Sequence, residues 1–141
     1  MRYLAIDYGT KRTGLAICDP TETIVSPLAV VQSKKGLVEK ISELIETESI
    51  GAIVLGLPLN MDDSQGPQAK LVLKFAEQLG NALKIPVHLQ DERLSSFAAE
   101  GKLSSANLTR ARREERIDAV AAAEILGAFF ERNKPKKTPK K

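Results

Sequence analysis

Four acidic side chains of this 141-residue sequence fall where acids could do chemistry. Asp7 closes a short apolar run, and Asp91 and Glu92 close a later one. Asp118 begins an alanine-rich stretch. Functional groups gather at the carboxyl ends of the strands in open α/β sheets, and both strand-end positions fit that rule. Taken singly, an acid at a strand end is more often a turn or cap residue, so it is the combination that favours function.

Asp118 has apolar neighbours at helical spacing, namely Ala121, Ala122 and Ile125. Its carboxylate is therefore predicted to face the sheet, and small alanines would let the helix approach closely enough to bring it near Asp7. A buried carboxylate must be neutral, paired or bound to a metal ion. The alternative is an acid in the first turn of a helix, stabilised by the helix dipole.

The metal predicted for such a cluster is Mg²⁺ or Mn²⁺, because carboxylates supply only oxygen ligands. Two such ions about 4 Å apart can activate a water and stabilise the leaving oxygen of a phosphodiester. Zinc is not favoured, since Cys18 is the only cysteine. The lone His88 is more often a structural residue than a catalyst.

Basic side chains flank the acids. Lys11 and Arg12 follow Asp7 by a few residues, and Arg93 directly follows Glu92. Beside a metal cluster they could bind the phosphates around the scissile bond, although local pairing with the acids is the alternative.

Two further segments are candidate nucleic-acid contacts. The polar loop 60–67 includes Asn60 and precedes an expected helix, so it either contacts the substrate or caps the helix. A cluster of arginines lies just before Asp118 and could become ordered on RNA or DNA; its members are Arg110, Arg112, Arg113 and Arg116.

The elements that must position these residues follow from the apolar periodicity. Strands are predicted at 3–7, 13–18, 24–31, 52–57 and 87–90, and helices at 37–45, 71–83, 96–102 and 117–132. The first three strands form an antiparallel meander, and the last two are parallel because a helix connects them. The prediction is an α/β fold with a five-stranded mixed sheet and helices on its faces.

Composition indicates one domain with a separate tail. The chain is 43% hydrophobic and 28% charged, which is typical of a globular protein. Its net charge of +3 depends on five lysines in residues 133–141, a stretch with two prolines and no acid. We therefore expect a domain at 1–132 and a disordered tail at 133–141 that binds phosphates or only aids solubility. No signal peptide or membrane helix is evident, and a single thiol is ordinary for the cytoplasm.

Four ordered blocks of the sequence resemble the motifs of the YqgF/RuvX proteins. They are Asp7-Tyr8-Gly9-Thr10-Lys11-Arg12-Thr13-Gly14, the run from Val54 to Asp62, Asp91-Glu92-Arg93-Leu94-Ser95-Ser96, and Ile117-Asp118-Ala119-Val120-Ala121-Ala122. The resemblance spans nearly all of residues 1–132 and departs from the family at Asp63, where glycine is usual. It implies a ribonuclease H-like fold, kinship with Holliday-junction resolvases, and a nuclease role in maturing the 5′ end of 16S ribosomal RNA.

By that resemblance the metal-binding and catalytic acids are Asp7, Glu92 and Asp118. Asp91 is kept in reserve, because adjacent residues of a strand face opposite sides and the sequence does not say which acid points inward. The predicted function is a metal-dependent endonuclease acting on pre-16S rRNA, with ribosomal precursor particles as further partners and a monomer or homodimer as the unit.

Three alternatives remain open. They are a resolvase acting on branched DNA, a noncatalytic RNA-binding factor, and a phosphotransferase of the actin and sugar-kinase superfamily. Length disfavours the last, because that superfamily binds its nucleotide between two such domains.

Overall fold

The computed structural model describes residues 1–32, 34–62, 64–92 and 110–133. Its five strands form one sheet in the order β3-β2-β1-β4-β5. The strands are β1 (Arg2–Tyr8), β2 (Thr13–Cys18), β3 (Val25–Val31), β4 (Ile50–Leu57) and β5 (Val87–Asp91), and the helices are α1 (Leu37–Thr47), α2 (Pro67–Ala82) and α4 (Arg110–Asn133). The predicted mixed sheet is confirmed, since β1, β2 and β3 pair antiparallel while β4 pairs parallel with both β1 and β5.

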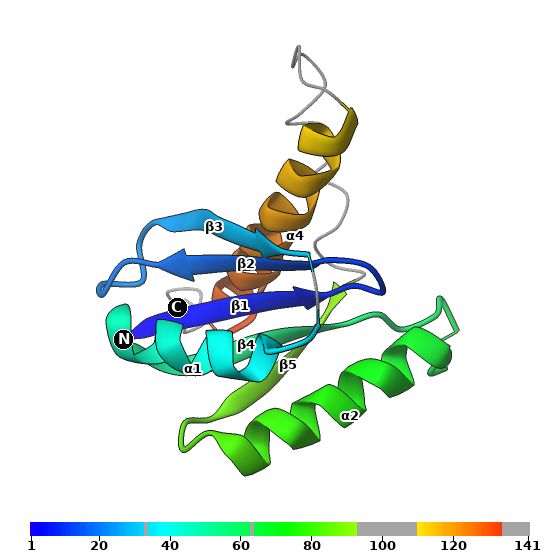
Figure 1. The fold of residues 1–141 in the computed structure, drawn as a ribbon, viewed down its shortest axis with the longest axis horizontal. Coiled ribbons are helices and arrows are strands. Elements are labelled where there is room, and N and C mark those ends of the chain that lie inside the picture. The colour runs from blue at the N-terminus through cyan, green and yellow to red at the C-terminus, as the bar shows by residue number, and fades with distance from the viewer. Residues whose placement is uncertain (33, 63, 93–109, 134–141) are drawn as a thin grey trace, which may run out of the picture.

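Helices cover both faces of the sheet, with α1 and α2 on one side and α4 crossing the other (Figure 1). The alternation of side chains along β1 assigns each residue to a face. Leu4 and Ile6 join the core under α1 and α2, whereas Ala5 packs with Ala122 and Leu126 of α4. Asp7 is two residues beyond Ala5, so this alternation directs its side chain toward α4.

Two helices begin earlier than the sequence pattern predicts. Helix α2 starts at Pro67, since proline is well suited to the first turn of a helix. Helix α4 starts at Arg110, not at residue 117, because arginine and glutamate are good helix formers even without an apolar pattern. Asp118 is therefore two turns inside α4, which removes its interpretation as a first-turn acid that interacts with the helix dipole. The helix predicted at 96–102 lies outside the described residues.

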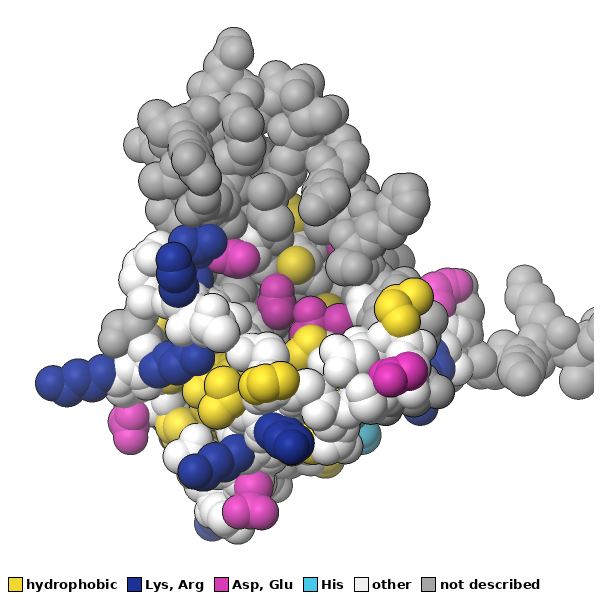
Figure 2. Space-filling model, turned by 90° about the vertical axis from the view of Figure 1, so that its right-hand side faces the viewer, with side chains coloured by type: hydrophobic (Ala, Val, Ile, Leu, Met, Phe, Trp, Pro, Cys, Tyr) yellow, Lys and Arg dark blue, Asp and Glu magenta, His cyan; other side chains and the backbone are white. Residues whose placement is uncertain are grey.

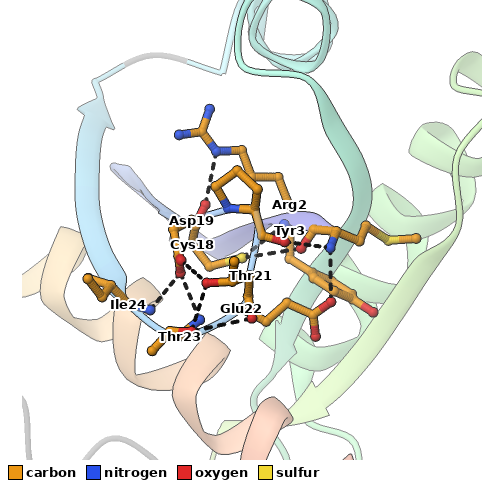
Figure 3. A network of polar contacts seen from close by, with 10 residues as sticks. Arg2, Tyr3, Cys18, Asp19, Thr21, Glu22, Thr23 and Ile24 are labelled. Atoms are coloured by element: carbon orange, nitrogen blue, oxygen red, sulfur yellow. Dashed lines mark hydrogen bonds and ion pairs between the residues drawn. The ribbon is translucent and has the colours of Figure 1, made fainter.

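At the end of the sheet where β1 starts, a polar network surrounds the turn between β2 and β3 (Figure 3). The Asp19 carboxylate accepts hydrogen bonds from the backbone N–H groups of Thr23 and Ile24 at 2.7 and 2.6 Å. These bonds to the charged form hold the pKa of Asp19 below its usual range. Arg2 donates to the carbonyls of Cys18 and Glu48, at 3.1 and 3.0 Å. The start of β1 is thereby fixed to two neighbouring segments.

Candidate active site

Asp7 lies near the carboxyl end of β1 and is only partly exposed. Its pKa is raised from 3.8 to about 6, first by burial and second by the negative charge of Asp118. Both causes disfavour the ionised carboxylate in the folded chain. A cation placed beside Asp7 would reverse that balance, which is the behaviour expected of a metal ligand.

Asp118 reaches the sheet because β2 carries a glycine where α4 crosses it. Gly14 pairs with Asp7 across the β1–β2 ladder. A Cβ added to Gly14 would lie 2.1 Å from the carbonyl oxygen of Asp118, so any side chain there would push the helix away. Ala119 and Ala122 are buried against the sheet on the same helix. Small residues on both elements therefore bring the helical acid to the end of β1.

Glu92 follows directly after β5 and lies over β4. A Cβ added to Gly56 would be 2.8 Å from Cγ of Glu92 and 2.6 Å from Cδ1 of Ile125 in α4. Glu92 is thus on the same face of the sheet as Asp7. Burial raises its pKa from 4.5 to about 8, and the charges of Asp7 and Asp91 add to the effect.

Asp91 occupies a different position from its neighbour Glu92. It pairs with Leu57, whose side chain packs into the core under α1 and α2. The pleat of β5 therefore directs Asp91 toward that side of the sheet, away from α4. The charge of Asp118 acts on Asp7, and the charges of Asp7 and Asp91 act on Glu92, so the structure places Asp7 close to both Asp118 and Glu92.

Arg12 forms an ion pair with Asp118, with 2.6 Å between Nε and Oδ2. The arginine and aspartate side chains are 26% and 24% exposed, so the pair is mostly shielded from water. Lys11, the preceding residue, is exposed. Figure 2 looks onto the edge of the molecule where β1 ends, and shows acidic side chains gathered near its centre with Lys and Arg side chains to one side.

The loop after β4 is held by its own hydrogen bonds. The backbone N–H of Asn60 donates to the carbonyl of Ser64 at 2.9 Å, and its side-chain amide donates to the Ser64 hydroxyl at 2.9 Å. Helix α2 is capped by Gly66 without a side-chain hydrogen bond, so the loop does not supply a side-chain helix cap. Asn60 is exposed, and its contact with nucleic acid stays a prediction.

The remaining predicted contacts are arginines. Arg93 lies outside the described residues, and Arg110, Arg112 and Arg113 are in the first turns of α4, where only the course of the helix is described. Their binding roles stay predictions.

Sequence reasoning missed the groups that fix the end of β1. The Tyr8 ring stacks on Phe75 of α2 with 4.1 Å between ring centroids, and Lys34 lies over the Tyr8 ring at 4.1 Å. Gln68 donates a 2.6 Å hydrogen bond to the Tyr8 carbonyl. Aromatic residues at core-like spacing gave no signal of this role. Together these contacts hold the backbone next to Asp7 in place.

Gln90 was also missed. It is fully buried two residues before Glu92, and its Oε1 accepts a 3.4 Å hydrogen bond from Arg132. Its Nε2 has no hydrogen-bond partner among the described residues. A polar residue inside the β5 strand pattern was the available signal.

In the described part of the chain, no three or more His, Cys, Asp or Glu side chains are already placed so as to hold a metal ion. None of the described helices is long and apolar enough to cross a membrane.

Known structures share this architecture. Thermus thermophilus RuvC in complex with a Holliday junction substrate superimposes with a TM-score of 0.56 and 16% identity, over 94% of this chain and 96% of that one. Fowlpox virus resolvase with Holliday junction DNA gives a TM-score of 0.58 and 12% identity, over 96% and 100%. The sheet order and the helices on both faces define an α/β protein of the ribonuclease H-like class, as predicted.

Within that class the chain belongs to the RuvX family, whose model, described as "RuvX: Holliday junction resolvase", matches residues 1–132. A protein of Maridesulfovibrio salexigens is 40% identical over 134 residues, covering 94% of this chain and 99% of the relative. One of Syntrophomonas wolfei subsp. wolfei is 45% identical over 134 residues, covering 93% and 94%. Both relatives bear the name "Putative pre-16S rRNA nuclease". The family resemblance drawn from the four motifs is confirmed.

Proposed function

We propose that this chain is a divalent-metal-dependent endonuclease that hydrolyses phosphodiester bonds in structured RNA. Its substrate in this proposal is the precursor of 16S rRNA, processed at the 5′ end in the cytoplasm. The observation that carries the proposal is the arrangement of Asp7, Asp118 and Glu92. They come from β1, α4 and the end of β5, and Asp7 lies within electrostatic reach of both of the other acids on one side of the sheet.

The donor set fits Mg²⁺ or Mn²⁺. All three groups offer carboxylate oxygens, and burial, followed by the charges of neighbouring carboxylates, raises the pKa values of Asp7 and Glu92. Bound divalent ions would supply the charge that favours a hydroxide nucleophile and stabilises the leaving oxygen. The carboxylates of Asp7, Glu92 and Asp118 would hold those ions, while Lys11 and Arg12 would orient the phosphate backbone. The contacts of Tyr8 with Phe75 and Gln68 hold the neighbouring Asp7 in position at the end of β1.

The names of the relatives support RNA as the substrate. The family description favours a second candidate, the resolution of branched DNA. A resolvase must cut two strands and would act as a homodimer, whereas trimming one RNA end needs a single site.

The test is a cleavage assay on two substrates, a 16S rRNA precursor with its 5′ leader and a four-way DNA junction. Each is incubated with the full chain in Mg²⁺, in Mn²⁺ and in chelator. We expect metal-dependent cutting of the RNA, greatly reduced by Glu92→Gln. The matched control is Glu46→Gln, which removes an exposed acid of α1 and should leave cutting unchanged. Cutting of the junction alone would select the second candidate, and binding without cutting would indicate an RNA-binding factor.

A further inference from the structure

Arg12 forms an ion pair with one member of the acidic group, Asp118. Its backbone is fixed by the turn between β1 and β2, where the N–H of Gly9 donates to the Arg12 carbonyl at 3.0 Å. A Cβ on Gly9 would lie 2.4 Å from that oxygen, so glycine is needed for the turn. The turn positions the backbone of Arg12, so a change of partner requires only a movement of its side chain.

The Asp118 carboxylate has two competing partners, Arg12 and the proposed metal ion. In the free protein its Oδ2 accepts a charge-assisted hydrogen bond from Nε of Arg12 at 2.6 Å. Under the proposed function the same carboxylate binds a divalent ion, and the guanidinium binds a phosphate. A short contact between two mostly shielded charges competes with both of these tasks.

We propose that Arg12 is an exchangeable counter-ion, which neutralises Asp118 in the free protein and transfers to a phosphate of the nucleic acid as divalent metal takes its place. The inference rests on the proposed function and deepens it, because it makes metal and nucleic acid bind cooperatively. Loss of the ion pair exposes Asp118 to the metal, and the guanidinium fork donates two hydrogen bonds to a phosphate in its place. Such coupling is reciprocal, so each ligand strengthens the binding of the other.

Lys11 is the matched comparison. It carries the same charge in the same turn, yet its side chain is exposed, whereas that of Arg12 is 26% exposed and directed at Asp118. Removing either residue takes one positive charge from the neighbourhood of the acids. Only removal of Arg12 also takes away the competitor for Asp118.

The experiment measures binding of Mn²⁺ alone to the full chain by titration calorimetry for wild type, Arg12→Gln and Lys11→Gln. We expect Arg12→Gln to bind Mn²⁺ about tenfold more tightly than Lys11→Gln. In a second measurement, fluorescence anisotropy gives the affinity for a short RNA hairpin with and without Ca²⁺. Both variants should bind RNA more weakly than wild type, but the gain in affinity on adding Ca²⁺ should shrink only in Arg12→Gln.

Equal Mn²⁺ affinities in the two variants, together with an unchanged Ca²⁺ effect in Arg12→Gln, would overturn the exchange and leave the nuclease proposal standing. Absence of saturable Mn²⁺ binding in wild type would instead overturn the metal site itself, and the exchange with it. Circular dichroism checks that each variant is folded. If Arg12→Gln does not fold, Arg12→Lys replaces the fork by a single ammonium and should show Mn²⁺ affinity above that of wild type; a wild-type value would contradict the exchange.

Discussion

Replacing Asp7 by asparagine should stabilise the metal-free protein while it abolishes cleavage. The substitution keeps the size of the side chain and removes a carboxylate whose pKa is raised from 3.8 to about 6 by burial and by Asp118. An acid whose pKa is higher in the folded than in the unfolded state increasingly destabilises the folded state as pH rises from the unfolded-state pKa to the folded-state pKa. The full penalty above pH 6 is about 3 kcal/mol, at about 1.4 kcal/mol per pH unit. Imperfect hydrogen bonding of the new amide offsets about 1 kcal/mol of this.

The expected gain for Asp7→Asn is therefore about 2 kcal/mol at pH values near 8, whereas near pH 4, where most of the penalty is absent, the amide should leave the variant about 0.5 kcal/mol less stable than wild type. The measurement is urea unfolding in chelator at both pH values, with Glu46→Gln as the control for loss of an exposed charge. Cleavage should fall by orders of magnitude, whereas RNA binding in Ca²⁺ should fall little, because basic groups supply most of the affinity. A variant that is less stable than wild type near pH 8, or that cleaves normally, would refute the reasoning.

Three further predictions concern positioning and the tail. In thermal melts, Gly14→Ala should lower the free energy of unfolding by about 2 kcal/mol or more, and it should weaken cleavage, because the new Cβ would displace α4. The control is Gly80→Ala, on the exposed side of α2 with open space around it, which should be neutral or stabilising by about 0.5 kcal/mol. Gln90→Met should leave stability unchanged or raise it by about 1 kcal/mol in urea unfolding, since it removes a buried donor without a described partner, and a loss above about 2 kcal/mol would contradict this. Deleting residues 133–141 should flatten the salt dependence of RNA binding by roughly 0.7–0.9 in log–log slope per lost lysine contact, and an unchanged slope would mean that the tail only aids solubility.

The strands, the antiparallel pairing of the first three and the parallel pairing of the last two were predictable, because apolar alternation and the helical crossover leave few arrangements. The parallel pairing of β4 with β1, which joins the two groups, was not part of that prediction. The start of α4 could not be predicted, because the arginine-rich segment has helix propensity but no apolar stripe to mark it. The choice between Asp91 and Glu92 was also beyond the sequence, because it depends on the register of β5 against β4. The Arg12–Asp118 pair joins residues far apart in the chain, so only the packing of α4 over Gly14 reveals it.

The most direct test of the account is to locate the metal. Crystals of the full chain grown in Mn²⁺, with anomalous diffraction data collected, should show manganese between the carboxylates of Asp7, Glu92 and Asp118, with Arg12 turned away from Asp118. Crystals of Asp7→Asn under the same conditions should lose that signal. Manganese bound only elsewhere, or none at these carboxylates at saturating Mn²⁺, would contradict the claim that they form the catalytic metal site.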